Sequence, residues 1–318
     1  MATVTAIAGF VAGLILVVYF AEKLVEGVVG TARGFGVSAF VVSVVFIGFD
    51  AENLAVGAAG AWEGVFGIAL GSVLGAAMVA VALAFGITAL IAPMRFEHAP
   101  RRILAVAPLA VLLLGTLALD GLLSRVDGAL LLATYAASVV YLYRLGRRGI
   151  VISAAGELAE SLEEAEQRGR WKSLGLLLLA LVAIVAGSEL LVEGARGLIG
   201  LTGIGETVFA MTVLALLVSI EELARELPAA LKGRPDISFG NVIGSVLAFF
   251  LFNAGVIALV RPIPIAPEVI RFYLPMAAVS VLFICAVVAT RAIPRWAGGV
   301  LVLLYGLFVA GAFAGWGR

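Results

Sequence analysis

The sequence predicts an all-helical membrane protein that crosses the bilayer many times. Hydrophobic residues make up 63% of its 318 residues and charged residues only 13%, whereas roughly 25% of the residues in soluble domains are charged. The mean hydropathy is +1.17. A soluble domain of this length cannot bury so much apolar surface, so many apolar side chains must face lipid.

Apolar segments of about 20 residues, long enough to span a bilayer, follow one another along the whole chain. The first, "TAIAGFVAGLILVVYF", has no basic region before it and no small-residue cleavage site after it, so we expect a retained helix rather than a signal peptide. Several segments exceed the spanning length, so tilted or broken helices are expected. We predict ten transmembrane helices, at residues 4–30, 38–62, 66–93, 102–120, 127–146, 173–199, 206–231, 238–260, 267–290 and 295–316.

The longest polar stretch runs from Arg144 to Lys172, and its middle, Ala154 to Gln167, predicts a short charged surface helix. A solvated connector is favoured over a calcium-sensing role for its glutamates. Lysine and arginine concentrate on the cytoplasmic side of membrane proteins. Placing this loop in the cytoplasm puts most other basic residues there and both termini outside the cytoplasm. We expect the protein in the cell membrane of a prokaryote.

The two halves of the sequence resemble each other. "AEKLVEGVVG" at Ala21 is similar to "SELLVEGARG" at Ser188, and "GIALGSVLGAAM" at Gly67 is similar to "DISFGNVIGSVL" at Asp236. Each half holds five predicted helices, and an odd number inverts the second copy, as in many transporters. We predict a first repeat at 1–146, a cytoplasmic connecting loop at 147–172 and a second repeat at 173–318, with a site between the repeats.

These motifs resemble those of the cation/calcium antiporter superfamily, which includes the sodium/calcium exchangers. That family's repeats each carry a stretch like "G-T-S-x-P-E-L" followed by "G-N-x-x-G-S-N". Here the second repeat reads "LVSIEELARELPAALKGRPDISFGNVIGSV" and the first reads "GFDAENLAVGAAGAWEGVFGIALGSVLGAA". The resemblance covers nearly the whole chain and implies a sodium/calcium exchanger-like fold of ten transmembrane helices in two inverted five-helix repeats.

The resemblance also implies where the transported ions bind. The family's two key glutamates fall on Asn53 and Glu222, and the serines before them fall on Asp50 and Ser219. Asn53 keeps an oxygen but loses a charge, and Asp50 is a plausible substitute for a serine. The implied ion-binding set is Asp50, Asn53, Ser219, Glu222 and Ser245, with Glu222 and Asp50 as the metal ligands.

This chain departs from the family at several other ligand positions. The family's threonines, one "GS" serine and two later amides or acids fall on Phe49, Val218, Ala76, Ala80 and Phe249. The lost oxygens argue against a site that holds one calcium and three sodium ions together. Extra acids make proton coupling attractive, because a carboxylate removed from water readily takes up a proton.

Helical spacing supports one shared site. Ser219, Glu222 and Glu226 are separated by three and four residues, so they share a helix face, and Asp50 and Asn53 share the equivalent face in the first repeat. Hard cations prefer such carboxylate, carbonyl and hydroxyl oxygens, and a broken helix supplies further carbonyls. We expect the neighbouring helices to approach closely at four glycines, Gly71, Gly75, Gly240 and Gly244.

Four residues near this site have an open role in proton coupling or in flanking the site: Glu52, Glu221, Arg225 and Glu226. Arg225 follows Glu221 by four residues and Glu222 by three, so it can pair with either. It either neutralises Glu221 on the flank or occupies the site as an internal cation that substrate or a proton displaces. A third alternative places Arg225 and Glu226 at the cytoplasmic interface, where long side chains reach water.

The leading hypothesis is a secondary-active antiporter that moves Ca²⁺ or a similar cation against Na⁺ or H⁺ by alternating access. Its expected partners are the lipid bilayer and small inorganic cations, with no nucleic acid and no resident cofactor, and the oligomeric state stays open. One alternative is a non-transporting, sensor-like relative. An intramembrane enzyme is disfavoured, because "EELAR" is one residue short of an E-E-x-x-x-R motif and the only histidine, His98, lies in a loop.

Overall fold

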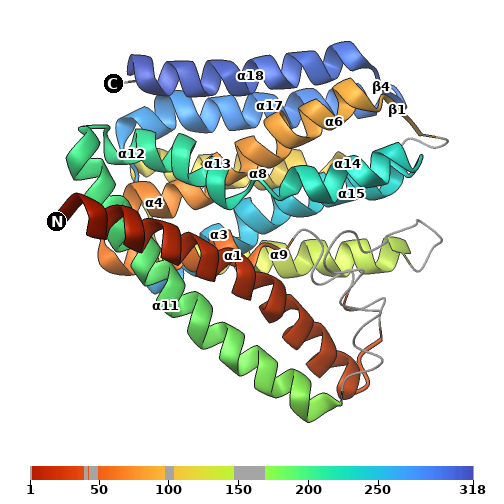
Figure 1. Ribbon diagram of the computed structural model, residues 1–318. Coiled ribbons are helices and arrows are strands. Elements are labelled where there is room, and N and C mark those ends of the chain that lie inside the picture. The colour runs from red at the N-terminus through yellow and green to blue at the C-terminus, as the bar shows by residue number, and fades with distance from the viewer. Residues whose placement is uncertain (1, 39–41, 43–48, 97–103, 147–168, 318) are drawn as a thin grey trace.

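The structure, a computed structural model of the chain, describes residues 2–38, 42, 49–96, 104–146 and 169–317. The expected surface helix at 154–167 and most of the first part of the expected span at 38–62 lie outside these residues. The described chain is almost wholly helical (Figure 1). The all-helical prediction is therefore confirmed.

In the first half, several helical pieces follow one another without a loop between them. Five of them form the run from Phe66 to Ile91, which alternates α-helical and wider π-helical turns. The elements of this half are α1 (Ala2–Gly34), α3 (Ala51–Glu63), α4 (Phe66–Leu70), η1 (Gly71–Gly75), α5 (Ala76–Met78), η2 (Val79–Ala84), α6 (Phe85–Ile91), β1 (Met94–Arg95), α8 (Val106–Leu117), η3 (Ala118–Asp120), β2 (Leu122–Leu123) and α9 (Arg125–Gly146).

The second half has the same general order. Its run from Pro235 to Val260 again contains a π-helical segment, and π-helical segments are frequent at functional sites. The elements are α11 (Arg170–Thr202), α12 (Glu206–Phe209), η4 (Ala210–Leu214), α13 (Ala215–Val218), α14 (Glu222–Leu231), α15 (Pro235–Leu247), η5 (Ala248–Asn253), α16 (Ala254–Val260), β3 (Ile263–Pro264), η6 (Val269–Tyr273), α17 (Leu274–Val288), β4 (Ala292–Ile293) and α18 (Arg295–Ala314).

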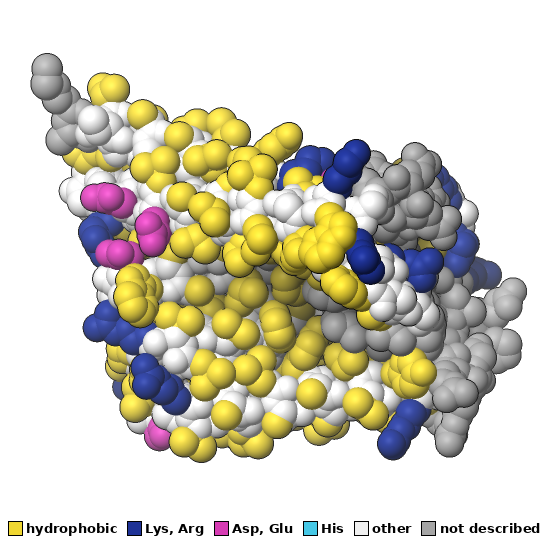
Figure 2. Space-filling model, turned by 90° about the horizontal axis from the view of Figure 1, so that it is seen from below, with side chains coloured by type: hydrophobic (Ala, Val, Ile, Leu, Met, Phe, Trp, Pro, Cys, Tyr) yellow, Lys and Arg dark blue, Asp and Glu magenta, His cyan; other side chains and the backbone are white. Residues whose placement is uncertain are grey.

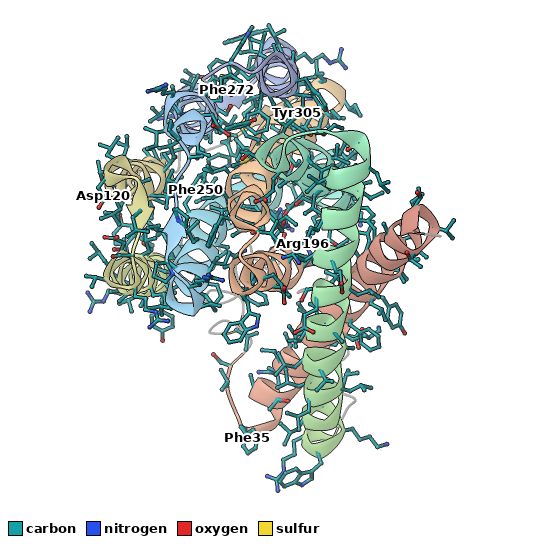
Figure 3. All side chains as sticks on the ribbon, turned by 90° about the vertical axis from the view of Figure 1, so that its left-hand side faces the viewer. Phe35, Asp120, Arg196, Phe250, Phe272 and Tyr305 are labelled. Atoms are coloured by element: carbon teal, nitrogen blue, oxygen red, sulfur yellow. The ribbon has the colours of Figure 1, made fainter. Side chains whose placement is uncertain are left out.

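Helices α1 and α11 form a long pair that projects from the rest of the bundle (Figures 1 and 3). Both are 33 residues long. Glycine allows their close approach: a Cβ at Gly27 would lie 2.6 Å from the Leu177 nitrogen, and one at Gly187 would lie 2.8 Å from Leu16 Cβ. Phe35 is at the far end of this pair, whereas Phe250, which is fully buried, lies inside the bundle (Figure 3).

The inner layer of the bundle consists of the two runs Phe66–Ile91 and Ile237–Val260, and most of each is buried. Two short antiparallel ribbons join the halves, because β1 pairs with β4 and β2 pairs with β3. Each ribbon therefore takes one strand from each half. The two halves are interleaved rather than separate globules.

Seven helices in the described residues are long and apolar enough to cross a membrane, or eight if a bent pair counts as one span. The bent pair, Glu206–Val218 and Glu222–Leu231, turns by 50°. Within the described residues α3 and α8 are shorter than a full span, so the count of ten spans stays a prediction. Figure 2 shows a broad apolar face with charged side chains gathered toward its two ends, as expected for a multi-pass membrane protein.

Candidate functional site

Two irregular segments meet at the candidate site, one from each half. In the first half, Asp50 is extended (φ −132°, ψ 100°) and caps the N-terminus of α3. In the second half, the helix stops at Val218 and resumes at Glu222, and Ser219 lies between the two pieces. Broken helices inside a membrane expose backbone groups that must be satisfied by other protein groups or by ions. The expected helix break is therefore present.

A hydrogen-bond network joins the halves through Asn53. The Asn53 amide nitrogen donates to Asp50 Oδ2 at 2.9 Å and to Ser219 Oγ at 2.8 Å, while its backbone N–H donates to Asp50 Oδ1 at 2.7 Å. Asp50 and Ser219 are fully buried, and Asn53 is 1% exposed. These three predicted ion ligands therefore lie together, at the contact between the first and second halves.

Glu222, the fourth predicted ligand, is held mainly by its own half. Its Oε2 accepts a hydrogen bond from the Asn241 amide at 3.0 Å, and its Oε1 lies 3.4 Å from Ser245 Oγ. Both donors come from α15. Glu222 also interacts electrostatically with Asp50 across the halves, so the two expected metal ligands belong to one charged region.

Arg225 lies among three glutamates from both halves. Its Nη2 is 2.6 Å from Glu221 Oε1 and 3.8 Å from Glu52 Oε1, and its Nη1 is 3.4 Å from Glu222 Oε1. The arginine side chain is only 10% exposed. The flanking interaction with Glu221 is thus the shortest, but the guanidinium reaches Glu222 and Glu52 as well. Glu226 is fully buried and the Arg225 side chain is 10% exposed, so neither side chain reaches into water as the interfacial alternative requires.

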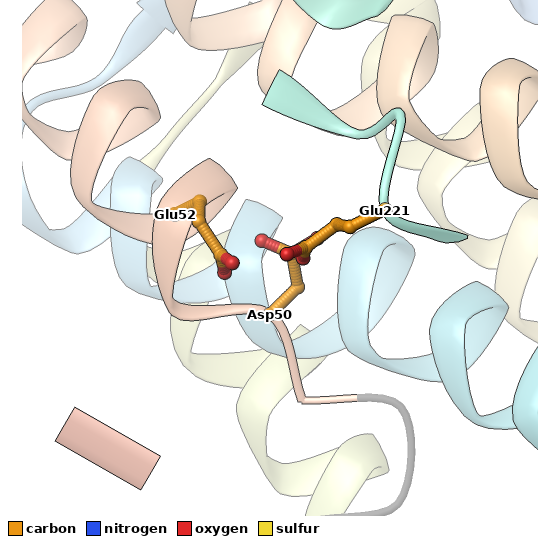
Figure 4. A group of neighbouring side chains, drawn as sticks. All are labelled: Asp50, Glu52 and Glu221. Carbon is orange, nitrogen blue, oxygen red and sulfur yellow. The ribbon is translucent and has the colours of Figure 1, made fainter. Parts of the chain in front are cut away.

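Three carboxylates converge at the junction of the halves. One carboxylate oxygen from each of Asp50, Glu52 and Glu221 lies within 4.8 Å of the others, and their side chains point toward one another in Figure 4. The sequence predicts Asp50 and Glu222 as the metal ligands, and the structure additionally brings Glu52 and Glu221 close to Asp50. The reason is the helix break: Glu221 precedes α14 and reaches the first half, whereas Glu222 begins α14 and faces α15.

The charges in this region do not balance. The carboxyl groups of Asp50, Glu52, Glu221, Glu222 and Glu226 surround a single guanidinium, that of Arg225. Ionised carboxylates this close repel strongly in a low dielectric unless cations or protons neutralise them. The arrangement can therefore hold hard cations, protons or both.

Asn241 is a site residue outside the ion-binding set that the sequence predicts. Its amide donates directly to Glu222 at 3.0 Å. Its position four residues before Ser245, on the same face of α15, is the signal that could have placed it at the site.

The glycines of the paired motifs differ in their packing. A Cβ at Gly71 would lie 2.7 Å from the Ala210 carbonyl group, and one at Gly75 would lie 2.6 Å from Ala215 Cβ, so the expected close approach is present there. Gly244 is buried. At Gly240 the expectation fails, because a Cβ would meet nothing within 4 Å. Helix α15 therefore has no close neighbour at Gly240, whereas η1 packs tightly on η4.

Comparison with known families gives one match across the chain. The family described as "Sodium/calcium exchanger protein" matches residues 5–144 and 172–314. Those two segments cover both halves and leave out the connecting loop. They contain every site residue described above.

Individual relatives match over most of their length. The inner membrane protein YrbG of Escherichia coli is 30% identical over 304 residues, which cover 94% of this chain and 93% of YrbG. The sodium/calcium exchanger MaX1 of Methanosarcina acetivorans is 27% identical and covers 95% of this chain and 96% of MaX1. Among solved structures, the sodium-calcium exchanger NCX_Mj, soaked with Na⁺ and Sr²⁺, superposes with a TM-score of 0.62 at 26% identity, covering 97% of this chain and 98% of that one.

Proposed function

Because the chain belongs to the sodium/calcium exchanger family, we propose that it is a secondary-active antiporter that moves Ca²⁺ or a similar cation against Na⁺ or H⁺. Its relatives include proteins named as sodium/calcium exchangers, which supports cation transport. They also favour a transporter over the intramembrane enzyme. His98, the only histidine, lies outside the described residues.

The observation that carries the proposal is the buried polar contact between the halves. Asn53 donates to Ser219 and Asp50 in an otherwise apolar bundle, and the flanking acids add carboxylate oxygens. Oxygen ligands from carboxylates, amides and hydroxyls are what Na⁺ and Ca²⁺ require. We assign ion binding to Asp50, Asn53, Ser219, Glu222 and Ser245, with Glu52 and Glu221 completing the negative charge.

We further propose that Arg225 acts as an internal cation. Its guanidinium contacts glutamates from both halves, Glu221, Glu222 and Glu52. In this state it takes part of the neutralising role that a transported ion would otherwise fill. Movement of the arginine away from Glu222 would open that carboxylate to a cation, so substrate and arginine would compete.

Alternating access requires two arrangements of the halves around the site. We propose inverted repeats at 1–146 and 173–318, joined by a cytoplasmic loop at 147–172, with Asp50 and Glu222 near the midplane. The equal lengths of α1 and α11, and the π-helical segments η2 and η5 at matching places in the two runs, support two copies of one plan.

The decisive experiment is flux in proteoliposomes of purified protein. Gradients of Ca²⁺, Na⁺, Mg²⁺, Mn²⁺ and H⁺ are imposed separately, and uptake of each cation is followed. The expected result is cation uptake that depends on an opposing cation or proton gradient. A matched control is Glu193→Gln, which removes an acid from an exposed position on α11. If correctly folded wild-type protein moves no cation under any gradient, the antiporter assignment fails. The sensor-like alternative would then be favoured.

The proposed orientation has its own test. Single cysteines replace the exposed residues Thr3 and Arg144 in turn, and Cys285 can remain because it is buried. A maleimide that cannot cross membranes is added to intact cells. Labelling at residue 3 but not at residue 144 is expected. The reverse pattern would invert the scheme.

A further inference from the structure

One carboxylate lies beyond the cation-binding residues and has no partner of its own. Glu226 follows Glu222 by one helical turn on α14 and is fully buried. Neither of its carboxylate oxygens has a hydrogen-bond partner. The nearby Asn241 amide interacts with Glu226, but its hydrogen bond of 3.0 Å is to Glu222. A buried ionised carboxylate without a partner is costly, so this group needs a ligand.

The equivalent position of the first half carries no acid. The residue equivalent to Glu226 is Gly57, and a Cβ there would overlap both Ser72 Oγ and Ile257 Cδ1. The Ser72 hydroxyl is itself satisfied, since it donates to the Ala69 carbonyl at 2.9 Å. The space that the first half fills with apolar atoms and a satisfied hydroxyl therefore holds an acid in the second half.

The groups around Glu226 define which ligand suits it. Helix α14 packs against α15, α6 and η2. Neither α6 nor η2 contains a titratable residue, and α15 contains one, Asp236, in its first turn. The charged groups that act on Glu226 from its own helix are Glu222 and Arg225. A Na⁺ or Ca²⁺ ion needs about six oxygen ligands, whereas a proton needs one carboxylate oxygen.

We propose that Glu226 is the binding site of the coupling proton. This inference rests on the proposed antiport and specifies its driving ion. The carboxyl group holds a proton while Glu222 lacks a cation, because two adjacent negative charges repel. When a cation arrives at Glu222, that repulsion is neutralised and the proton can leave Glu226 to water. Proton and cation thus displace each other through charge, and the effect is reciprocal.

The exit for this proton lies toward the turn between α14 and α15. Beyond Glu226, α14 ends at Leu231, and Lys232 and Gly233 are exposed. Two further buried hydroxyls without partners, those of Ser238 on α15 and Thr88 on α6, belong to the helices packed on α14. By the proposed orientation this end faces the cytoplasm.

The test separates proton coupling from cation binding. Wild-type protein, Glu226→Gln and Glu226→Leu are reconstituted, and two rates are measured with radioactive Ca²⁺: uptake driven by a pH gradient, and exchange of Ca²⁺ for Ca²⁺ without Na⁺ or a pH gradient. Both neutral variants should lose pH-driven uptake by about tenfold or more, because a membrane-buried acid acts as the proton carrier. Calcium self-exchange measured at saturating Ca²⁺ should stay within about twofold, because Glu226 supplies no ligand atom to the cation and its charge alters affinity rather than the saturated rate.

The second variant guards against a folding defect. Leucine removes an unpartnered polar group from a buried place, which costs little stability. Glu226→Asp keeps an acid and should retain pH-driven uptake. The proposal would be overturned if both neutral variants took up Ca²⁺ at the wild-type rate under a pH gradient. It would also be overturned if folded variants lost pH-driven uptake and calcium self-exchange equally. Absence of both rates in the wild type would instead contradict the proposed antiport. In that case pH-dependent infrared absorption of a protonated carboxyl group, present in the wild type and absent in Glu226→Leu, would still support proton binding at Glu226.

Discussion

The two halves contribute to one site but carry different charges there. In the first half, Asp50 and Asn53 form a hydrogen-bonded pair, and the next turn carries Val56 and Gly57. In the second half, Ser219 and Glu222 stand at the equivalent places, and the next turn carries Arg225 and Glu226. The backbone plan repeats, but the second half supplies the only cation among the described groups at the site.

The two halves also differ in how tightly their motif helices are packed. The first motif helix is wedged against η4 at Gly71 and Gly75, whereas the second motif helix is open at Gly240. We propose that the first half provides a tightly packed wall, and that the second half contains the groups whose charge or position changes during the proposed transport. Each prediction below tests whether this division of roles holds.

The largest effect is expected at Glu222. Glu222→Gln removes a negative charge with almost no change in volume, and it should lower cation flux by about a hundredfold or more, since disturbing even the outer partners of an ion ligand costs 10- to 100-fold. The measurement is flux in proteoliposomes beside Glu193→Gln, which alters an exposed acid. Flux equal to that of the wild type would mean that the first half, with Asp50, is sufficient to bind the ion.

The next effect concerns Arg225 and its first-half counterpart, Val56. Arg225→Ala leaves Glu52, Glu221 and Glu222 without their shared cation, and loss of one partner from a buried ion pair costs roughly 3–5 kcal/mol. Cation-free protein should therefore melt at a lower temperature. If Arg225 is an internal cation, the affinity for Ca²⁺ should rise by about tenfold, because a competing charge is gone.

Val56→Ala is the matched control. Val56 is 1% exposed, so its truncation lowers the melting temperature through lost packing, and cation affinity should stay unchanged. Thermal melts with and without Ca²⁺, and isothermal titration of each variant, measure both quantities. A fall in affinity for Arg225→Ala would show that the arginine positions the acids rather than competing with the ion.

Much of the fold could be predicted because it follows from local pattern. The lengths of the apolar segments predict the helices, and segments longer than a span, together with a cation site that needs backbone carbonyls, predict a broken helix. The structure places the break between Val218 and Glu222. The family, too, could be recognised from the two motifs and is confirmed by the match across both halves.

The partners of each carboxylate could not be predicted in the same way. Helical spacing shows that Asp50 and Glu222 occupy equivalent faces, but it does not fix the rotation of α14 after a 50° bend. That rotation sends Glu221 toward Asp50 and Glu52, and Glu222 toward Asn241. The openness at Gly240 also depends on how neighbouring helices stack, which the motif does not encode.

A smaller effect should follow from adding one methyl group to each motif helix. At Gly71 a Cβ would lie 2.7 Å from the Ala210 backbone, and overpacking of this kind costs about 1–3 kcal/mol. At Gly240 a Cβ meets nothing within 4 Å, so alanine should stabilise the helix by roughly 0.5–1 kcal/mol. Melting temperatures of Gly71→Ala and Gly240→Ala should move in opposite directions; equal losses would mean that both motif helices are equally confined.

The smallest effect is expected at Ser245, whose hydroxyl lies 3.4 Å from Glu222. That distance is at the outer limit of a hydrogen bond, so Ser245→Ala should weaken cation binding by about 0.5–1.5 kcal/mol. This corresponds to roughly a 2- to 10-fold higher half-saturating cation concentration in flux assays.

The first-half equivalent of Ser245 is Ala76, which is fully buried. Adding Ala76→Ser to Ser245→Ala restores the number of hydroxyls but places the new one in the half that lacks Glu222. A serine in a helix can satisfy itself on a preceding carbonyl, so the double variant should fold and still transport like Ser245→Ala. Recovery of the wild-type half-saturating concentration would show that the two halves are interchangeable around the ion, and the division between a tightly packed first half and a responsive second half would have to be abandoned.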